Sequence, residues 1–260
     1  MSAISSSPGD PTIRILLMGR NDSGRSSSGN TILRENKFKK HESEVCEGQT
    51  QIGDIQVYVI DCPDLLNPDL NKEQQEMMKE QLVSRCSAGL SSVLLTIPLE
   101  QPVQNEEEIL DYIKCLFGPE VQKYIMILFT YEHELDQTIA EHLKHKDHVD
   151  LQRLVTECGG KFHCFNNRIT SDNQIQELLH KIEGKMLENG GKFIMKQMKR
   201  SDSKASLFQE SFQQEIQVHL AHKRKDQIRL VLLGKKLDQG KVPLEMPLSA
   251  ETCFNSEEMM

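Results

Sequence analysis

The chain has 260 residues, of which 27% are charged and 37% are hydrophobic, and its formal net charge at pH 7 is -8. This length accommodates one α/β domain of roughly 190–200 residues together with an extension. The acidic balance argues against nucleic acid as the partner, since no basic face is evident. The seven cysteines are an odd number spread along the chain, which fits reduced thiols in the cytosol better than a disulfide framework.

The sequence shows no pattern of a membrane or export signal. No apolar run approaches the roughly 20 residues that span a bilayer. Residues 1–10 are rich in Ser, Gly and Pro and lack the apolar stretch of a secretory signal. Ser2 stands where myristoylation needs glycine, and the C-terminus has no prenylation box. We therefore expect a cytoplasmic protein with no transmembrane segment, in which residues 1–10 form a disordered lead-in.

The first motif is a phosphate-binding loop with one departure from the standard pattern. The apolar run over residues 13–18 predicts a buried strand, and residues 27–34 predict the first turns of a helix. Between them, residues 19–26 (GRNDSGRS) match G-x-x-x-x-G-K-[ST], except that Arg25 replaces the lysine. In such a turn, backbone N–H groups point at a phosphate, and the helix N-terminus adds partial positive charge.

Strands and helices alternate along the first 190 residues. The predicted strands are residues 13–18, 55–60, 90–97, 124–129 and 161–165. The predicted helices are residues 25–33, 73–86, 105–117, 151–157 and 173–188. Two of the strands are almost continuously apolar, as expected where helices cover both faces of a sheet. The pattern predicts an α/β fold with a mostly parallel sheet flanked by helices, and ligands at the carboxyl ends of its strands.

The second motif follows the strand over residues 55–60. This strand runs into Asp61, whose carboxylate would hold Mg²⁺ beside the Ser26 hydroxyl. GTPases continue the motif as D-x-x-G, but here Asp64 occupies the glycine position. A carboxylate there would repel a γ-phosphate and would be strained at any positive backbone φ.

Several further stretches share the pattern of one family. They are residues 13–19 (IRILLMG), 28–33 (SGNTIL), 60–65 (IDCPDL), 94–99 (LLTIPL), 117–118 (FG), 124–130 (YIMILFT), 158–163 (CGGKFH), 165–168 (FNNR) and 188–191 (ENGG). Together they closely resemble the GTPases of immunity-associated proteins (GIMAP), and the resemblance covers about residues 11–200. The set as a whole is specific, although each stretch alone is a weak signal.

The resemblance implies a P-loop NTPase fold, namely a Ras-like G domain with a C-terminal helical extension. It implies binding of GTP or GDP with Mg²⁺, usually slow hydrolysis, and nucleotide-dependent association with itself or with other G domains of the family. It also implies roles in immune cells at intracellular membranes, and hence peripheral membrane association. The residues that the motifs place at the nucleotide are Gly19, Arg20, Asn21, Asp22, Ser23, Gly24, Arg25, Ser26, Ser27, Asp64, Thr130, Tyr131, His133, Glu134, Asn166 and Asn167, with Ser26 and Asp61 on Mg²⁺.

Four motif positions depart from the family pattern: Arg25, Cys46, Asp64 and His133. Cys46 aligns with the switch threonine, and a thiol ligates Mg²⁺ poorly. His133 stands where a carboxylate usually recognises guanine, with Glu134 beside it, so the choice between guanine and adenine stays open. Two functions follow as alternatives. One is a GTP-binding module whose GTP-bound state controls self-association, with slow or absent hydrolysis and no assigned catalytic residue. The other is a pseudo-GTPase scaffold that has lost nucleotide switching.

Other groupings of reactive residues have simpler explanations. His142, His145 and His148 recur at helical spacing, which favours a solvated helix edge over a metal site. Cys158, His163 and Cys164 lack a fourth zinc ligand, and residues 161–165 are better explained as a core strand. These residues are therefore not predicted to hold a metal.

The C-terminal part repeats the opening of the chain. Residues 226–235 (DQIRLVLLGK) match residues 11–20 (PTIRILLMGR), although an ordinary amphipathic strand would fill many of the same positions. We predict a G domain over residues 11–190, a helical extension over 191–225, and a truncated start of a second G domain over 226–260. The last segment is expected to be disordered, because a lone first strand has no sheet to join.

Overall fold

The computed structural model describes residues 12–99, 106–131, 149–169 and 171–195. The predicted lead-in, most of the helical extension and the repeated segment over residues 226–260 lie outside the described residues. So do His133 and Glu134 of the base motif, and the histidines at 142, 145 and 148.

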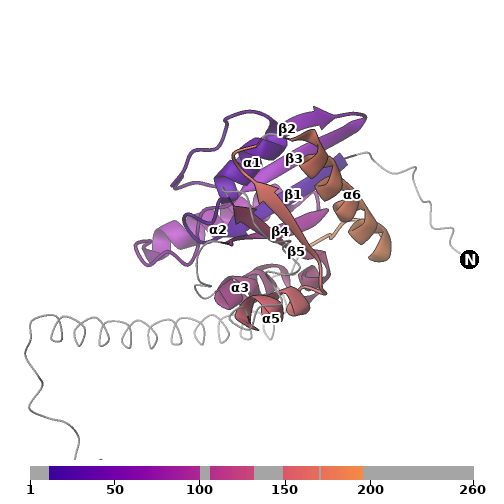
Figure 1. Cartoon of the computed structure of the whole chain (residues 1–260). Helices are drawn as coiled ribbons and strands as arrows, with labels where there is room; N and C mark the ends of the chain where they lie inside the picture. Colours follow the sequence, from indigo (N-terminus) through magenta and orange to yellow (C-terminus); the bar gives the residue numbers. More distant parts are fainter. Residues whose placement is uncertain (1–11, 100–105, 132–148, 170, 196–260) are drawn as a thin grey trace, which may run out of the picture. The chain divides into compact units, whose positions relative to one another are not determined.

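A six-stranded sheet forms the centre of the domain, with the strand order β2-β3-β1-β4-β5-β6 (Figure 1). Its strands are β1 (Thr12–Gly19), β2 (Cys46–Ile52), β3 (Ile55–Asp61), β4 (Ser92–Pro98), β5 (Ile125–Tyr131) and β6 (Phe162–Asn166). β1, β3, β4, β5 and β6 pair in parallel, and only β2 runs antiparallel, against β3. The predicted α/β fold with a mostly parallel sheet is confirmed. Because the strands are parallel, Gly19, Asp61, Pro98, Thr130 and Asn166 all lie at one edge of the sheet.

Helices connect the strands. They are α1 (Arg25–Leu33), α2 (Lys72–Cys86), α3 (Glu106–Phe117), the short 3₁₀ helix η1 (Pro119–Tyr124), α5 (Val149–Glu157) and α6 (Asp172–Glu188). The five helices predicted from the sequence are confirmed, with ends that shift by at most two residues. The start of α2 has a local cause: the Asn71 side chain caps the Gln74 backbone N–H, and the Gln74 side chain returns a bond to the Asn71 N–H.

The helices cover both faces of the sheet. Alternate residues of β1 belong to one core cluster, where Ile13, Ile15 and Leu17 join side chains of α1 and α6. On the opposite face in Figure 1 lie α2, α3 and α5. Each of these helices buries apolar residues, among them Leu82, Ile113 and Leu154. Burial on both faces explains the near-continuous apolar runs of β1, β4 and β5.

The strand missing from the sequence prediction is β2. Its sequence, CEGQTQI, is polar except at its ends, and Gln49 is exposed. An edge strand of this kind gains most of its order from backbone pairing to β3, so its side chains carry little strand signal.

The packed body of the domain extends past the predicted boundary at residue 190. Phe193 forms a β-bridge with Leu90, which lies just before β4, through N–H···O bonds of 2.7 and 2.8 Å. Its ring lies 6.4 Å from that of Phe117 and 5.5 Å from that of Tyr124. Residues 191–193 therefore belong to the G-domain body and not to a separate extension.

Candidate nucleotide-binding site

The loop between β1 and α1 has the geometry that its motif predicts. β1 ends at Gly19, and α1 begins at Arg25. Gly24 is the N-cap of α1, with a left-handed backbone at φ 78, a conformation that favours glycine. Gly24 has no side chain to cap the helix, so the positive end of α1 faces the loop directly.

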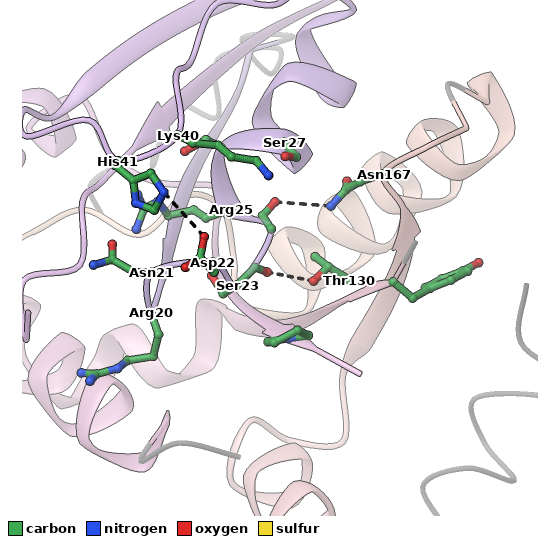
Figure 2. A pocket seen from close by; sticks show the side chains of 14 residues that line it. Arg20, Asn21, Asp22, Ser23, Arg25, Ser27, Lys40, His41, Thr130 and Asn167 are labelled. Atoms are coloured by element: carbon green, nitrogen blue, oxygen red, sulfur yellow. Dashed lines mark hydrogen bonds and ion pairs between the residues drawn. The ribbon is translucent and has the colours of Figure 1, made fainter. Parts of the chain in front are cut away.

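Side chains at three other strand ends bond to this loop, and Figure 2 shows two of them, Thr130 and Asn167. Thr130, in β5, donates from its hydroxyl to the Ser23 carbonyl oxygen over 2.8 Å. Asn167, just after β6, donates to the Gly24 carbonyl oxygen over 3.4 Å. At β4, the Thr96 and Ser23 hydroxyls lie 2.7 Å apart. The approach is so close that a Cβ on Gly24 would stand 2.8 Å from Thr130 Oγ1.

The loop borders a cavity of about 330 Å³ at the carboxyl edge of the sheet. Figure 2 shows the side chains that surround it. Its lining residues are Arg20, Asn21, Asp22, Ser23, Gly24, Arg25, Ser26, Ser27, Lys40, His41, Pro98, Thr130, Tyr131 and Asn167. All of them except Lys40, His41 and Pro98 were predicted from the sequence. The predicted residues Gly19, Asp64 and Asn166 do not line the cavity, and His133 and Glu134 lie outside the described residues.

The three lining residues that sequence reasoning missed come from two places. Lys40 and His41 belong to the segment between α1 and β2, and His41 has a positive φ of 60. His41 Nε2 lies 3.7 Å from Asp22 Oδ1, which brings this segment over the loop. Pro98 ends β4, at the sheet edge where ligands of such folds bind. The run of basic residues at 39–41 was a signal in the sequence, because cationic side chains commonly line sites that bind phosphate.

Asn166 is buried, but it supports the turn after β6 and does not face the cavity. Its side-chain oxygen accepts from the Arg168 N–H over 3.0 Å, and its own N–H donates to Gln174 Oε1 over 3.2 Å. Its neighbour Asn167 lines the cavity instead.

Arg25, the replacement for the P-loop lysine, is buried against Asp61. Its Nε donates to Asp61 Oδ1 over 2.5 Å, and its Nη1 donates to the Gly19 carbonyl oxygen over 3.1 Å. The Ser26 hydroxyl donates to the other carboxylate oxygen, Asp61 Oδ2, over 2.7 Å. Arg25 is 5% exposed and Asp61 is 2% exposed, so the ion pair is almost fully removed from water.

The predicted Mg²⁺ ligands, Ser26 and Asp61, are therefore brought together, but they do not fit a Mg²⁺ ion as they stand. Both carboxylate oxygens of Asp61 already accept hydrogen bonds, one of them from a cation. Mg²⁺ needs oxygen ligands at about 2.0–2.1 Å in near-octahedral geometry. An ion could reach Asp61 Oδ1 only after the Arg25 guanidinium had moved away. The assignment of Mg²⁺ to these two residues stays a prediction.

Asp64 does not show the expected backbone strain, but its carboxylate does lie against the P-loop. It is not among the described non-glycine residues with positive φ, so the expected backbone strain is absent there. Its buried carboxylate accepts from the Asn21 N–H of the P-loop over 3.2 Å and from the Leu66 N–H over 3.0 Å. Arg20 Nε lies 3.7 Å from the same carboxylate. A negatively charged side chain thus bonds to a loop N–H of the kind that P-loops offer to phosphate.

The two cysteines near the site are not poised for chemistry. Cys46 begins β2 opposite Asp61 and packs against the core cluster, and it does not line the cavity. Cys62 is buried, and burial raises the pKa of its thiol. A protonated, enclosed thiol is a poor nucleophile.

Comparison with known proteins agrees with this geometry. Residues 13–215 match the AIG1 family. Human GTPase IMAP family member 8 is 29% identical over 191 residues, which are 70% of this chain and 29% of that protein. Immune-associated nucleotide-binding protein 5 of Arabidopsis thaliana is 30% identical over 200 residues, which are 72% of this chain and 65% of that protein. The chain thus spans less than two thirds of the length of these relatives.

Solved structures show the same fold at low identity. Toc33 from Arabidopsis thaliana, crystallised with GDP and Mg²⁺, has a TM-score of 0.57 and 14% identity, covering 72% of this chain and 89% of that one. Era, in a complex with MgGDPNP and part of 16S ribosomal RNA, has a TM-score of 0.50 and 12% identity, covering 66% of this chain and 56% of that one. These neighbours are P-loop G domains, which confirms the predicted fold.

None of the described helices is long and apolar enough to cross a membrane. The match to the family model covers well over half of the chain, and it includes the P-loop and nearly the whole sheet. The chain therefore belongs to the AIG1 family, in agreement with its resemblance to the immunity-associated GTPases.

Proposed function

We propose that the chain is a guanine-nucleotide-binding module with slow or absent GTP hydrolysis, whose GTP-bound state controls self-association. The observation that carries the proposal is the preserved phosphate cradle. The loop between β1 and α1 keeps its left-handed Gly24, its open helix N-terminus and a cavity of about 330 Å³ in front of it. Phosphate affinity in P-loops rests largely on this backbone.

Hydrolysis is proposed to be slow for two reasons. Asp64 places a carboxylate on the Asn21 N–H, where charge would oppose a γ-phosphate. The Arg25 guanidinium occupies Asp61 Oδ1, one of the two carboxylate oxygens on which Mg²⁺ chemistry would depend. The same two observations favour the second candidate, a pseudo-GTPase scaffold that keeps the fold without switching.

Relatives supply the argument for guanine and for self-association. Proteins of the family are named GTPases or nucleotide-binding proteins, and Toc33 was crystallised with GDP and with GMPPNP. Toc33 has also been crystallised as a dimerisation-deficient mutant. We propose the same ligand class here and association with a second G domain, in the cytoplasm and with peripheral attachment to membranes. The motif assigns Mg²⁺ to Ser26 and Asp61, and Asp61 could take the ion at Oδ1 only once the Arg25 guanidinium had moved away.

Nucleotide binding is tested by titrating the full chain with labelled GTP, GDP and ATP. We expect both guanine nucleotides to bind and ATP to bind more weakly. Gly24→Ala should abolish or strongly weaken binding, because its Cβ would stand 2.8 Å from Thr130 Oγ1 at φ 78. Gly53→Ala is the matched control: Gly53 also has a positive φ, of 58, but a Cβ there meets no atom within 4 Å. Equal binding by both variants would show that the loop is not the phosphate site.

Switching is tested by sedimentation velocity of the full chain with GDP and with a non-hydrolysable GTP analogue. The switch predicts a larger assembly with the analogue than with GDP. If the chain is a scaffold without switching, its assembly should have the same mass with GDP, with the analogue and without nucleotide.

A further inference from the structure

We propose that the Arg25 guanidinium takes the place of Mg²⁺ at the phosphate site, so that nucleotide binding by this chain does not depend on a divalent ion. The inference rests on the proposed nucleotide binding, and it identifies the cation on which that binding depends. It starts from the position of Arg25, which donates to Asp61, the carboxylate that the motif assigns to the metal.

Geometry holds the guanidinium firmly in that position. One N–H group bonds to Asp61 Oδ1 over 2.5 Å, and another bonds to the Gly19 carbonyl oxygen over 3.1 Å. Arginine carries five N–H donors in a rigid plane, so two fixed bonds orient the whole group. A lysine ammonium is a compact point of charge on a flexible stem and lacks this fixed fork of donors. Arg25 also lines the cavity, where its other N–H groups can donate to phosphate oxygens.

Burial makes this arrangement hard to exchange for a metal. Arg25 and Asp61 are 5% and 2% exposed, and a buried charge that loses its partner is costly. Mg²⁺ would have to displace the guanidinium from Asp61 Oδ1, whereas the Ser26 hydroxyl could keep donating to Asp61 Oδ2 while its oxygen bound the ion. The displaced Arg25 guanidinium would lose its bond to the Asp61 carboxylate. The metal must therefore offset both the loss of this ion pair and its own dehydration, which Mg²⁺ resists.

The charge at the site is compatible with a metal-free phosphate. Asp22 also lines the cavity, Arg25 neutralises Asp61, and Arg20 lies 3.7 Å from Asp64, while Lys40 adds a further positive charge. These cations can balance part of the charge of a diphosphate without a divalent ion. Because Mg²⁺ would contribute two further charges, we expect the affinity to be lower than that of a G domain with the usual lysine and metal.

The experiment measures the affinity of the full chain for fluorescent GDP, once with Mg²⁺ and once with EDTA. For the natural sequence we expect the two dissociation constants to agree within about threefold. Arg25→Lys should restore metal dependence, with binding at least about tenfold tighter in Mg²⁺ than in EDTA. Arg34→Lys is the matched control, because Arg34 forms its ion pair with Asp172 at 2.8 Å and does not line the cavity. It should behave like the natural sequence.

A second readout does not depend on the variants. With GDP present, adding Mg²⁺ should leave the melting temperature of the natural sequence unchanged. A loss of tenfold or more in affinity on moving the natural sequence to EDTA would overturn the metal-free site while leaving nucleotide binding intact. The absence of GDP binding in both buffers would instead refute the proposed function, and this inference with it.

Discussion

Two substitutions change how charge is arranged at the phosphate site. Where GTPases place a glycine N–H, Asp64 places a carboxylate that is 5% exposed. Where they place a lysine on the phosphates, Arg25 is directed to Asp61. Each side chain is satisfied by hydrogen bonds within the protein, so neither leaves an unpaired buried charge. The site is therefore stable as it stands and less dependent on a ligand for its electrostatic balance.

Removing the Asp64 carboxylate should favour triphosphate over diphosphate. Asp64→Gly frees the Asn21 N–H and deletes a negative charge next to the loop, where the γ-phosphate would approach. We expect the affinity for a GTP analogue to rise a few-fold or more above any gain for GDP, since tenfold corresponds to only about 1.4 kcal/mol. Titration calorimetry with both nucleotides measures the difference.

Asp64→Asn separates charge from shape, because it keeps one oxygen acceptor for the Leu66 or Asn21 N–H. Asp69→Gly serves as a control at an exposed aspartate of the same loop. An equal gain for GDP and the GTP analogue would contradict the placement of Asp64 beside the γ-phosphate.

Among the secondary-structure elements, β6 is connected to α6 by His163. Its Nε2 lies 2.9 Å from the Gln174 carbonyl oxygen, and its Nδ1 lies 3.3 Å from Lys181 Nζ. The neutral ring satisfies both contacts when Nε2–H donates and Nδ1 accepts. Burial, together with the Lys181 charge, lowers the pKa of His163 to about 4. These contacts engage both ring nitrogens between β6 and α6.

The buried position of His163 predicts a pH-dependent stability. The unfolded histidine takes up its proton near pH 6.5, whereas the folded one does so only near its pKa of about 4. The unfolded state therefore binds more protons between these values, and stability falls as pH drops from about 6.5 towards 4. From pH 7 to pH 5 the loss should be about 2 kcal/mol.

Urea denaturation of the full chain at the two pH values checks this loss. His163→Gln can still donate to the Gln174 carbonyl oxygen but does not titrate, so it should lose about 2 kcal/mol less than the natural sequence over this range. His180→Gln, at an exposed position of α6, should retain the full loss. If His163→Gln and the natural sequence lose the same stability, the acid sensitivity arises elsewhere.

For the molecule as a whole, the end of the G domain is set by packing after α6. Phe193 is 6% exposed, and its backbone pairs with Leu90, just before β4. Loss of such an aromatic side chain costs about 3–5 kcal/mol. The body that must stay intact for folding therefore runs beyond residue 190.

Truncation should reveal this boundary. A chain that ends at residue 190 should melt roughly 10 °C lower than the full chain, because a domain of this size loses about 2–4 °C per kcal/mol. A chain that ends at residue 225 should melt within about 1–2 °C of the full chain and aggregate less, because we predict that the apolar run within residues 226–260 joins no sheet. Differential scanning calorimetry compares the three chains.

Phe193→Ala and Ile194→Ala in the full chain provide the matched pair. Ile194 is 62% exposed, so its loss should leave the melting temperature almost unchanged, whereas Phe193→Ala should lower it. A large drop in melting temperature on removing residues 226–260 would show that the repeated segment packs on the first domain and is not the start of a second G domain.

The order of the elements, the identity of the P-loop and the family could all be predicted from the sequence alone. Each of these depends on local signals: apolar runs for covered strands, helical spacing, and glycines that the turn after β1 requires. The antiparallel edge strand β2 left no such signal, because its side chains are polar and its order comes from pairing with β3.

What the departures from the motifs do became visible only in three dimensions. From the sequence, Arg25 and Asp64 were two defects at a phosphate site. In the fold, Asp61 lies 36 residues from Arg25 in the chain yet within 2.5 Å of it, and Asp64 reaches a loop N–H 43 residues away. Lys40 and His41 likewise join the cavity from a segment with no motif, and Pro98 joins it from a stretch that was not predicted to reach the nucleotide. Charge and hydrogen bonding act over a few ångströms in space, whatever the separation along the chain, and the sequence does not record those distances.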